Sequence, residues 1–121
     1  MALQYFNKRV FVERIGGDND AIISILSFAV SSNQDKFKET KNYTTRNQLY
    51  RFAHFMKGTC SNVNFDICAQ QCKELLDLTE PSKSENDKSI TPEMKEKLDE
   101  IGKSLQLTCG VVDAYISSKS G

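Results

Sequence analysis

Apolar residues recur along most of the chain at steps of three and four, the period of an α-helix with one buried face. The longest stripe runs from Met94 to Ile116 and is a seam for antiparallel packing rather than a cofactor site. It consists of Met94, Leu98, Ile101, Leu105, Cys109 (or Thr108), Val112 and Ile116. Strand signals are scarce. The pattern therefore predicts an all-α protein.

Two helices are predicted in the first third of the chain. A short helix spans Tyr5 to Ile15 and ends at Gly16-Gly17, and Asp18 or Asn19 caps the next one. The inner face of the short helix consists of Phe6, Val10, Phe11 and Ile15. The inner face of the second helix consists of Ile22, Ile25, Leu26, Ala29, Val30 and Phe37. Ile23 and Phe28 lie partly off this face, and no other segment is predicted to cover them.

Two more helices are predicted between residues 44 and 78. Thr44 or Thr45 caps the third helix, and Asn64 or Asp66 starts the fourth. The buried face of the third consists of Leu49, Phe52, Ala53, Met56, Cys60 and Val63. The buried face of the fourth consists of Ile67, Cys68, Cys72, Leu75 and Leu76.

A polar loop at about 79–91 separates these helices from the last one, which Thr91 caps and Pro92 opens. Four long helices with short connections and one short N-terminal helix predict an antiparallel up-down-up-down four-helix bundle. Residues 1–121 then make a single domain, most simply a monomer. The alternative is a helical hairpin that completes its core by dimerising. An initial Met and a full set of helices favour an independent protein over a domain cut from a larger one.

Composition narrows the function classes. Basic and acidic residues each number 16, so the chain has no net charge that would favour binding to nucleic acid or to a membrane surface. No signal peptide or membrane-spanning stretch is apparent, which favours a cytoplasmic protein. The four cysteines suit buried thiols better than disulfides, and the paired Cys/His elements of a zinc site are missing. We therefore expect no metal ion on this chain.

The single histidine, His54, is the most informative residue for function. At about 100° per residue, it shares the side opposite the apolar face with Lys57, Gly58 and Ser61. The imidazole is therefore predicted to face solvent. A cation one turn away stabilises added negative charge, and a residue without a side chain leaves room for a partner. The combination favours a phosphoryl group held on His54.

The same outer face carries candidate contacts for a partner protein. They are Asn47, Tyr50, Arg51, Ser61 and Asn62. Arg46 lies at the edge of the face, and no carboxylate occurs between Arg46 and Asn64. The face is thus predicted to be locally positive on a chain without net charge, which suits an acidic partner.

The run His54-Phe55-Met56-Lys57-Gly58, followed by Ser61-Asn62, resembles the His-x-x-Lys-Gly signature of histidine-containing phosphotransfer (HPt) domains. Residues 11–18 are similar to the short helix and turn that open many of these domains. Cys68, Cys72 and Leu75 match small and apolar positions of the helix that pairs with the histidine helix. The similarity covers residues 11–78, and the last helix is matched only by pattern.

The resemblance implies a phosphorelay intermediate rather than an enzyme. His54 would accept a phosphoryl group through Nε2, Lys57 would stabilise that group, and Gly58 would admit the partner. The partners would be receiver domains of response regulators and hybrid histidine kinases, which supply the Mg²⁺ and the acidic cluster, so this chain needs no cofactor. No glycine-rich nucleotide motif is present, and autophosphorylation is not expected.

Two alternatives and one departure accompany this interpretation. An HPt-like adaptor would bind a receiver or kinase without carrying phosphate. An enzyme that uses His54 as base or nucleophile is disfavoured, because a convex helix face provides no pocket. The departure is Asn64, which stands where the family often has glycine. Asparagine tolerates the left-handed conformation better than most residues, so the turn is expected to form.

Overall fold

The computed structural model describes residues 3–80 and 89–120, and these residues form helices and connections without a strand. The elements are α1 (Lys8–Ile15), α2 (Asn19–Glu39), the 3₁₀ helix η1 (Thr40–Asn42), α3 (Arg46–Asn62), α4 (Asp66–Thr79) and α5 (Pro92–Ser120). The prediction of an all-α fold is therefore confirmed for the described part of the chain.

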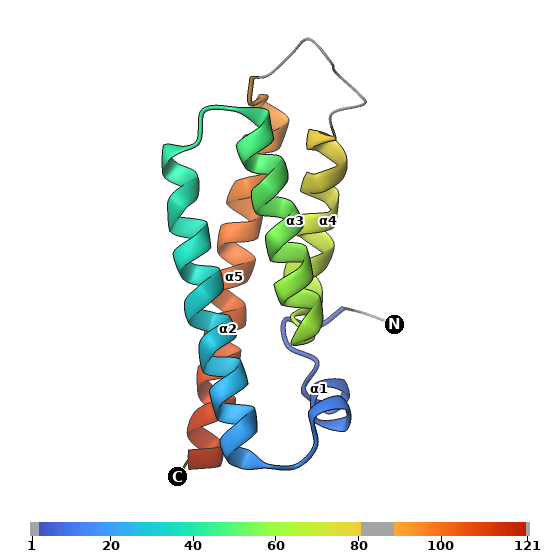
Figure 1. Cartoon of the computed structure of the whole chain (residues 1–121), viewed down its shortest axis with the longest axis vertical. Helices are drawn as coiled ribbons and strands as arrows, with labels where there is room; N and C mark the ends of the chain where they lie inside the picture. Colours follow the sequence, from blue (N-terminus) through green and yellow to red (C-terminus); the bar gives the residue numbers. More distant parts are fainter. Residues whose placement is uncertain (1–2, 81–88, 121) are drawn as a thin grey trace.

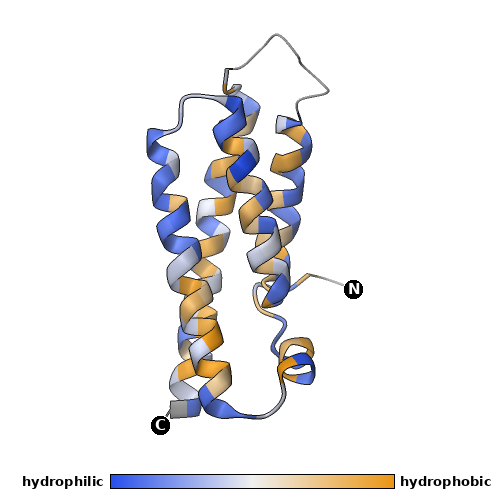
Figure 2. Ribbon diagram, in the orientation of Figure 1, coloured by the Kyte–Doolittle hydropathy of each residue, from blue (hydrophilic) through white to orange (hydrophobic). Residues whose placement is uncertain are grey.

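The four long helices lie lengthwise beside one another as a helical bundle (Figure 1). α2 packs against α3 and α5, and α4 packs against the same two helices. Apolar residues concentrate along the lower and inner parts of the helices, whereas the upper end of α2 is mainly polar (Figure 2). None of the helices described here has the length and apolar character required to cross a membrane.

The seam predicted for α5 faces the core. Its buried members are Met94, Ile101, Leu105, Thr108, Cys109 and Val112, while Leu98 and Ile116 are partly buried. Thr91 caps this helix as predicted, because its Oγ1 accepts a hydrogen bond from the Met94 amide at 3.2 Å. The packing and the cap together set where α5 begins and which face it buries.

The N-terminal helix is shorter than predicted. It begins at Lys8, and the Asn7 side chain accepts a hydrogen bond from the Val10 amide at its start. Phe6 is buried, but it precedes the helix and belongs to an irregular segment. Ile15, predicted on the inner face, is instead exposed, which is a correction: the helix ends there, next to Gly16 at φ 100°.

α2 begins after Asp18, whose carboxylate accepts hydrogen bonds from the amides of Asp20 and Ala21. This confirms one of the two predicted caps. Phe28, which lies off the predicted inner face, has an exposed fraction of 75%. Within the part of the chain that the structure describes, this phenylalanine is thus a surface residue.

The fourth helix begins at Asp66, one of the two predicted starts, but it ends later than predicted. Thr79, predicted to lie in a polar loop, is buried as the last residue of α4, where its hydroxyl donates to the Leu75 and Leu76 carbonyls. Satisfying that hydroxyl within the helix removes the cost of burying it. Ile67 and Leu76, predicted in the core, are partly buried. Most of the predicted 79–91 loop, residues 81–88, lies outside the described residues.

A buried polar chain joins all four long helices. Asn33 of α2 accepts a hydrogen bond from Thr59 of α3 at 2.6 Å and donates to the Cys60 sulfur at 3.6 Å. The Cys60 thiol is in turn hydrogen bonded to Cys68 of α4, and Cys68 lies 3.5 Å from the Thr108 hydroxyl of α5. These bonds satisfy polar groups that the core would otherwise leave without partners.

The cysteines behave as core residues. All four are buried and free, as the sequence predicts. Burial raises the pKa of the Cys72 thiol to about 12, so it is uncharged at neutral pH. An uncharged, enclosed thiol is a packing group rather than a nucleophile.

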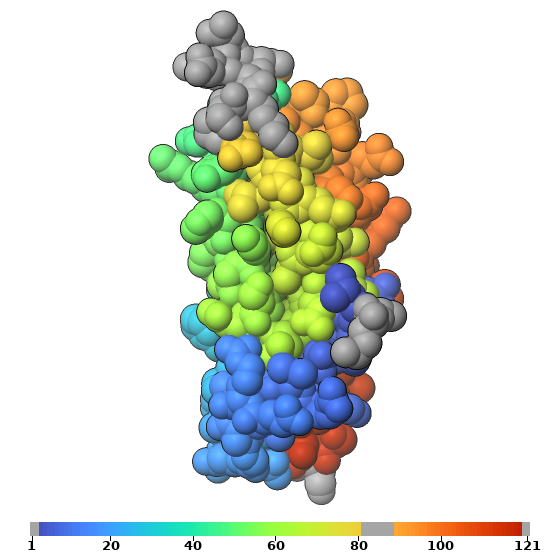
Figure 3. Space-filling view, turned by 90° about the vertical axis from the view of Figure 1, so that its right-hand side faces the viewer, coloured from blue at the N-terminus to red at the C-terminus, as the bar shows by residue number. Residues whose placement is uncertain are grey.

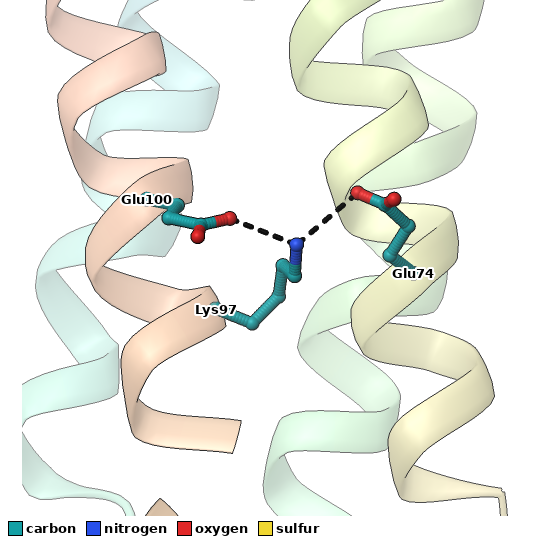
Figure 4. A network of polar contacts seen from close by, with 3 residues as sticks. All are labelled: Glu74, Lys97 and Glu100. Atoms are coloured by element: carbon teal, nitrogen blue, oxygen red, sulfur yellow. Dashed lines mark hydrogen bonds and ion pairs between the residues drawn. The ribbon is translucent and has the colours of Figure 1, made fainter. Parts of the chain in front are cut away.

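An ion-pair network on the surface links α4 to α5 (Figure 4). The Lys97 ammonium lies 3.2 Å from Glu74 of α4 and 2.8 Å from Glu100 of its own helix. Hydrogen bonds to Glu100 and Glu74 raise the pKa of Lys97 above its ordinary value. The network is partly solvated, so it fixes the alignment of the two helices more than it stabilises them.

Gly102 of α5 permits close approach of α2. A Cβ at this position would lie 2.5 Å from the tip of the Phe37 ring, whereas a Cβ at Gly110 would meet nothing within 4 Å. Both glycines are interior to the same helix, so replacing either by alanine gains the same propensity, about 1 kcal/mol. The difference in free energy of unfolding between the two alanine variants therefore measures the effect of packing at Gly102 alone.

We predict that Gly102→Ala is less stable than Gly110→Ala by about 2 kcal/mol, because the Phe37 ring must move out of its place beside Phe52. Urea unfolding followed by far-UV circular dichroism measures this difference. Equal free energies of unfolding for the two variants would mean that the ring relocates without cost.

Candidate functional site

The outer face of α3 presents the residues singled out in the sequence. The exposed ones are Asn47, Arg51, His54, Gly58, Ser61 and Asn62, and Tyr50 and Lys57 are partly buried. The helix begins with a capping box, in which Thr45 and Gln48 exchange hydrogen bonds between side chain and backbone. Its buried face consists of Leu49, Phe52, Ala53, Met56 and Cys60. This burial fixes the rotation of α3 and turns His54 to solvent, as predicted.

His54 is accessible and chemically unengaged. Its ring lies 6.4 Å from the Tyr50 ring, centroid to centroid. Among residues 3–80 and 89–120, the imidazole has neither a hydrogen-bond partner nor an ion-pair partner. Both ring nitrogens are thus available, and a neutral imidazole can offer one lone pair as a nucleophile or base.

Gly58 leaves open space one turn after His54. A Cβ built on it would meet nothing within 4 Å, so the glycine does not serve packing within the described chain. Glycine inside a helix costs about 1 kcal/mol relative to alanine. An unused gap beside an exposed imidazole is the geometry expected where another molecule approaches the ring.

The positive charge of this face comes from fewer residues than predicted. Arg46, predicted at the margin of the face, has an exposed fraction of only 9%, so it belongs to the start of the core rather than to the surface. The long aliphatic stem of arginine packs well at such a position. Arg51 and Lys57 remain as the cations of α3 near His54.

A recess on the α4 side of α3 was not predicted. It is lined by Leu3, Lys57, Ser61, Asp66, Ala69, Gln70 and Lys73. Figure 3 shows this side of the molecule, with α3 and α4 adjacent and the N-terminal segment and α1 below them. Helical periodicity carries no signal for this recess, because it depends on which turn of α4 packs beside which turn of α3.

The turn between α3 and α4 sets that packing. Asn64 adopts φ 60°, which confirms that asparagine takes the left-handed conformation here. The Phe65 amide donates to the Cys60 carbonyl at 2.9 Å, and the Asn64 amide donates to the Ser61 carbonyl at 3.3 Å. These two bonds form a Schellman motif. They end α3 and allow α4 to start directly afterwards, so the two helices are held in one register.

Residues from the N-terminal part of the chain brace this turn. The Arg14 guanidinium donates to the Asn62 carbonyl at 3.2 Å and to the Asn64 side chain at 3.1 Å. The Asn7 amide donates to the Asn64 carbonyl at 2.9 Å. The α3–α4 junction is therefore a supported element, and the recess above it has a defined shape.

The α2 side of α3 carries two exposed aromatic rings among polar and charged side chains. Phe55, which follows His54 in the sequence, has an exposed fraction of 38%, and Phe28 of α2 is more exposed still. Both rings border one groove between α2 and α3. The Lys36 ammonium, which also pairs with Glu39, lies 5.1 Å from the Phe55 ring centre. Exposed apolar surface next to a charged face is typical of a protein-binding site.

The described residues were also compared with the donor sets that hold metal ions in proteins. Among these residues, no group of three or more His, Cys, Asp or Glu side chains is arranged to hold a metal ion. The chemistry that the outer face does offer is nucleophilic attack by an imidazole, with ammonium and guanidinium groups nearby to stabilise negative charge.

Comparison with protein-family models, curated proteins and solved structures found no match to this chain. The function is therefore inferred from the site itself. Its elements are the accessible imidazole, the gap at Gly58, and the lysines that line the recess between α3 and α4.

Proposed function

We propose that the chain is a phosphorelay intermediate that accepts a phosphoryl group on His54 from the aspartyl phosphate of a receiver domain and passes it to another receiver. The observation that carries the proposal is the accessible, unengaged imidazole with open space at Gly58 and a cation at Lys57. Its residue pattern resembles that of HPt domains, and the all-helical fold agrees with that resemblance.

The transfer step needs one nucleophile and no cofactor on this chain. The Nε2 lone pair of neutral His54 attacks the phosphorus, and the P–O bond to the receiver's aspartate breaks with its electron pair retained by the carboxylate. The ring keeps its Nδ1 proton in this step and can release it to water. The reverse reaction delivers the group to a second receiver. Mg²⁺ and the acidic cluster would be the receiver's, so this chain is a carrier rather than an enzyme.

We propose for α2 to α5 the antiparallel up-down-up-down arrangement, in a monomer. The order of colours along the helices in Figure 1 supports it, as does the ring of neighbours α2–α3–α4–α5. In this arrangement the outer face of α3 remains free for a visiting domain. Arg51 and Lys57 suit an acidic receiver, and Phe28 and Phe55 extend the contact area on the α2 side.

In this proposal the chain transfers phosphoryl groups in the cytoplasm. The direct test is a phosphotransfer assay with purified proteins. Purified protein is incubated with a panel of receivers phosphorylated on aspartate, with Mg²⁺ present, and the label is followed with time. We expect an acid-labile, base-stable adduct on this chain that a second receiver removes. No adduct with any member of the panel would contradict the proposal. ATP alone should give none.

Gly58→Leu should slow phosphotransfer at least tenfold while leaving the protein as stable or slightly more stable, by up to about 1 kcal/mol. The new side chain would fill the gap beside His54, and its Cβ would meet nothing within 4 Å inside the molecule. Gly110→Leu is the matched control, because it adds the same side chain to open space on α5. Equal transfer rates for both variants would refute the clearance role of Gly58.

The second candidate is an adaptor that docks on a receiver or kinase without carrying phosphate. The exposed groove at Phe28 and Phe55 favours it, since docking there does not require the imidazole. The two functions differ in what removal of His54 does. Without His54, a carrier still binds its partner but no longer transfers a phosphoryl group. An adaptor without His54 keeps both its affinity for the partner and its biological output.

A further inference from the structure

Two lysines from different helices line one recess beside the histidine face. Lys57 comes from α3 and Lys73 from α4. Among the described residues, neither ammonium has a hydrogen bond or an ion pair, in contrast to Lys97 and Lys36, which pair with glutamates. Two unpaired like charges that face one recess repel each other, and an anion between them would remove that repulsion.

The surroundings of the lysines suit a small anion. Ser61 and Gln70 line the same recess and offer hydroxyl and amide donors. The carboxylate of the recess, Asp66, lies in the first turn of α4, next to the α3–α4 junction. Lys57 and Lys73 lie farther from that junction along their helices, and His54 lies farther still along α3, so the basic end of the recess is the end on the side of His54.

We propose that Lys73 is a second phosphoryl-binding residue, which together with Lys57 holds the phosphoryl group carried on His54 from the α4 side. This inference rests on the proposed function and extends its site from one helix to two. Transfer to His54 places a doubly negative group one helical turn from Lys57. An ammonium from α4 neutralises part of that charge without entering the face at Gly58, through which the receiver approaches.

The test measures single-turnover transfer from a phosphorylated receiver at increasing receiver concentration, so that the saturating rate and the half-saturating concentration are separated. Lys73→Ala should lower the saturating rate about tenfold, as loss of a charge-assisted hydrogen bond does, and Lys57→Ala should do the same. Lys73→Arg should restore most of the rate. Lys103→Ala is the matched control, since it removes an exposed lysine from α5, away from the recess.

The outcomes separate this inference from the proposed function. If wild-type protein forms the adduct but Lys73→Ala transfers at the rate of Lys103→Ala, the role of Lys73 is refuted and the phosphocarrier stands. A change confined to the half-saturating concentration would also refute it, since that is the signature of steering an acidic partner. Absence of any adduct on the wild type would refute the phosphocarrier itself. Circular dichroism of each variant confirms that the fold is retained.

Discussion

His54→Gln should form no detectable phosphoryl adduct, while its free energy of unfolding stays within about 0.5 kcal/mol of the wild type. Glutamine keeps a polar side chain of similar reach but has no nitrogen lone pair able to attack phosphorus, because its amide nitrogen is conjugated with the carbonyl. The stability should not change, because the imidazole is exposed and has no hydrogen-bond or ion-pair partner among the described residues. Radiolabel transfer and urea unfolding measure the two effects.

Binding to the receiver is the informative control for this variant. Since the substitution leaves Gly58 open and keeps Arg51 and Lys57, affinity for a receiver should be within about threefold of the wild type. Retained binding with lost transfer identifies a carrier. An adduct that survives the substitution would place the phosphoryl group on another residue, and an unchanged biological output without an adduct would favour the adaptor.

The helices and the exposure of His54 were predictable from the sequence. Both follow from local periodicity: once Phe52, Met56 and Cys60 are buried, the direction of His54 is fixed by the geometry of one helix. The helix caps and the left-handed turn residue were predictable for the same reason, because each depends on side-chain chemistry within a few residues. They are Asp18, Thr91 and Asn64.

The errors arose where a residue's surroundings come from elsewhere in the chain. Arg46 is buried although its position predicted the edge of a basic face, and Thr79 is buried although its neighbours predicted a loop. Lys73 has no distinguishing feature in the sequence, because its relation to Lys57 depends on the register of α4 against α3. That register is set by the Schellman turn and its braces, which a helical pattern does not contain.

The aromatic cluster under the N-terminal segment carries the largest expected effect on stability. Phe6 has an exposed fraction of 4% and lies outside any helix. Its ring makes edge contacts with Phe11, Phe65 and Tyr115, at centroid distances of 5.7, 5.8 and 5.4 Å. Through these contacts one side chain joins α1, the α3–α4 turn and α5. The backbone on either side of this ring also bonds to residues at the α3–α4 junction.

Phe6→Ala should therefore lower the free energy of unfolding by about 3–5 kcal/mol, the range for removing a buried phenylalanine and leaving a cavity. Phe28→Ala, the same substitution at an exposed ring of α2, is the matched control and should change stability by less than about 0.5 kcal/mol. Far-UV circular dichroism in urea suits the measurement, because the chain has no tryptophan. If Phe6→Ala were no more destabilising than Phe28→Ala, the N-terminal segment would not be part of the core. The support for the α3–α4 junction, and with it the defined recess beside His54, would then be lost.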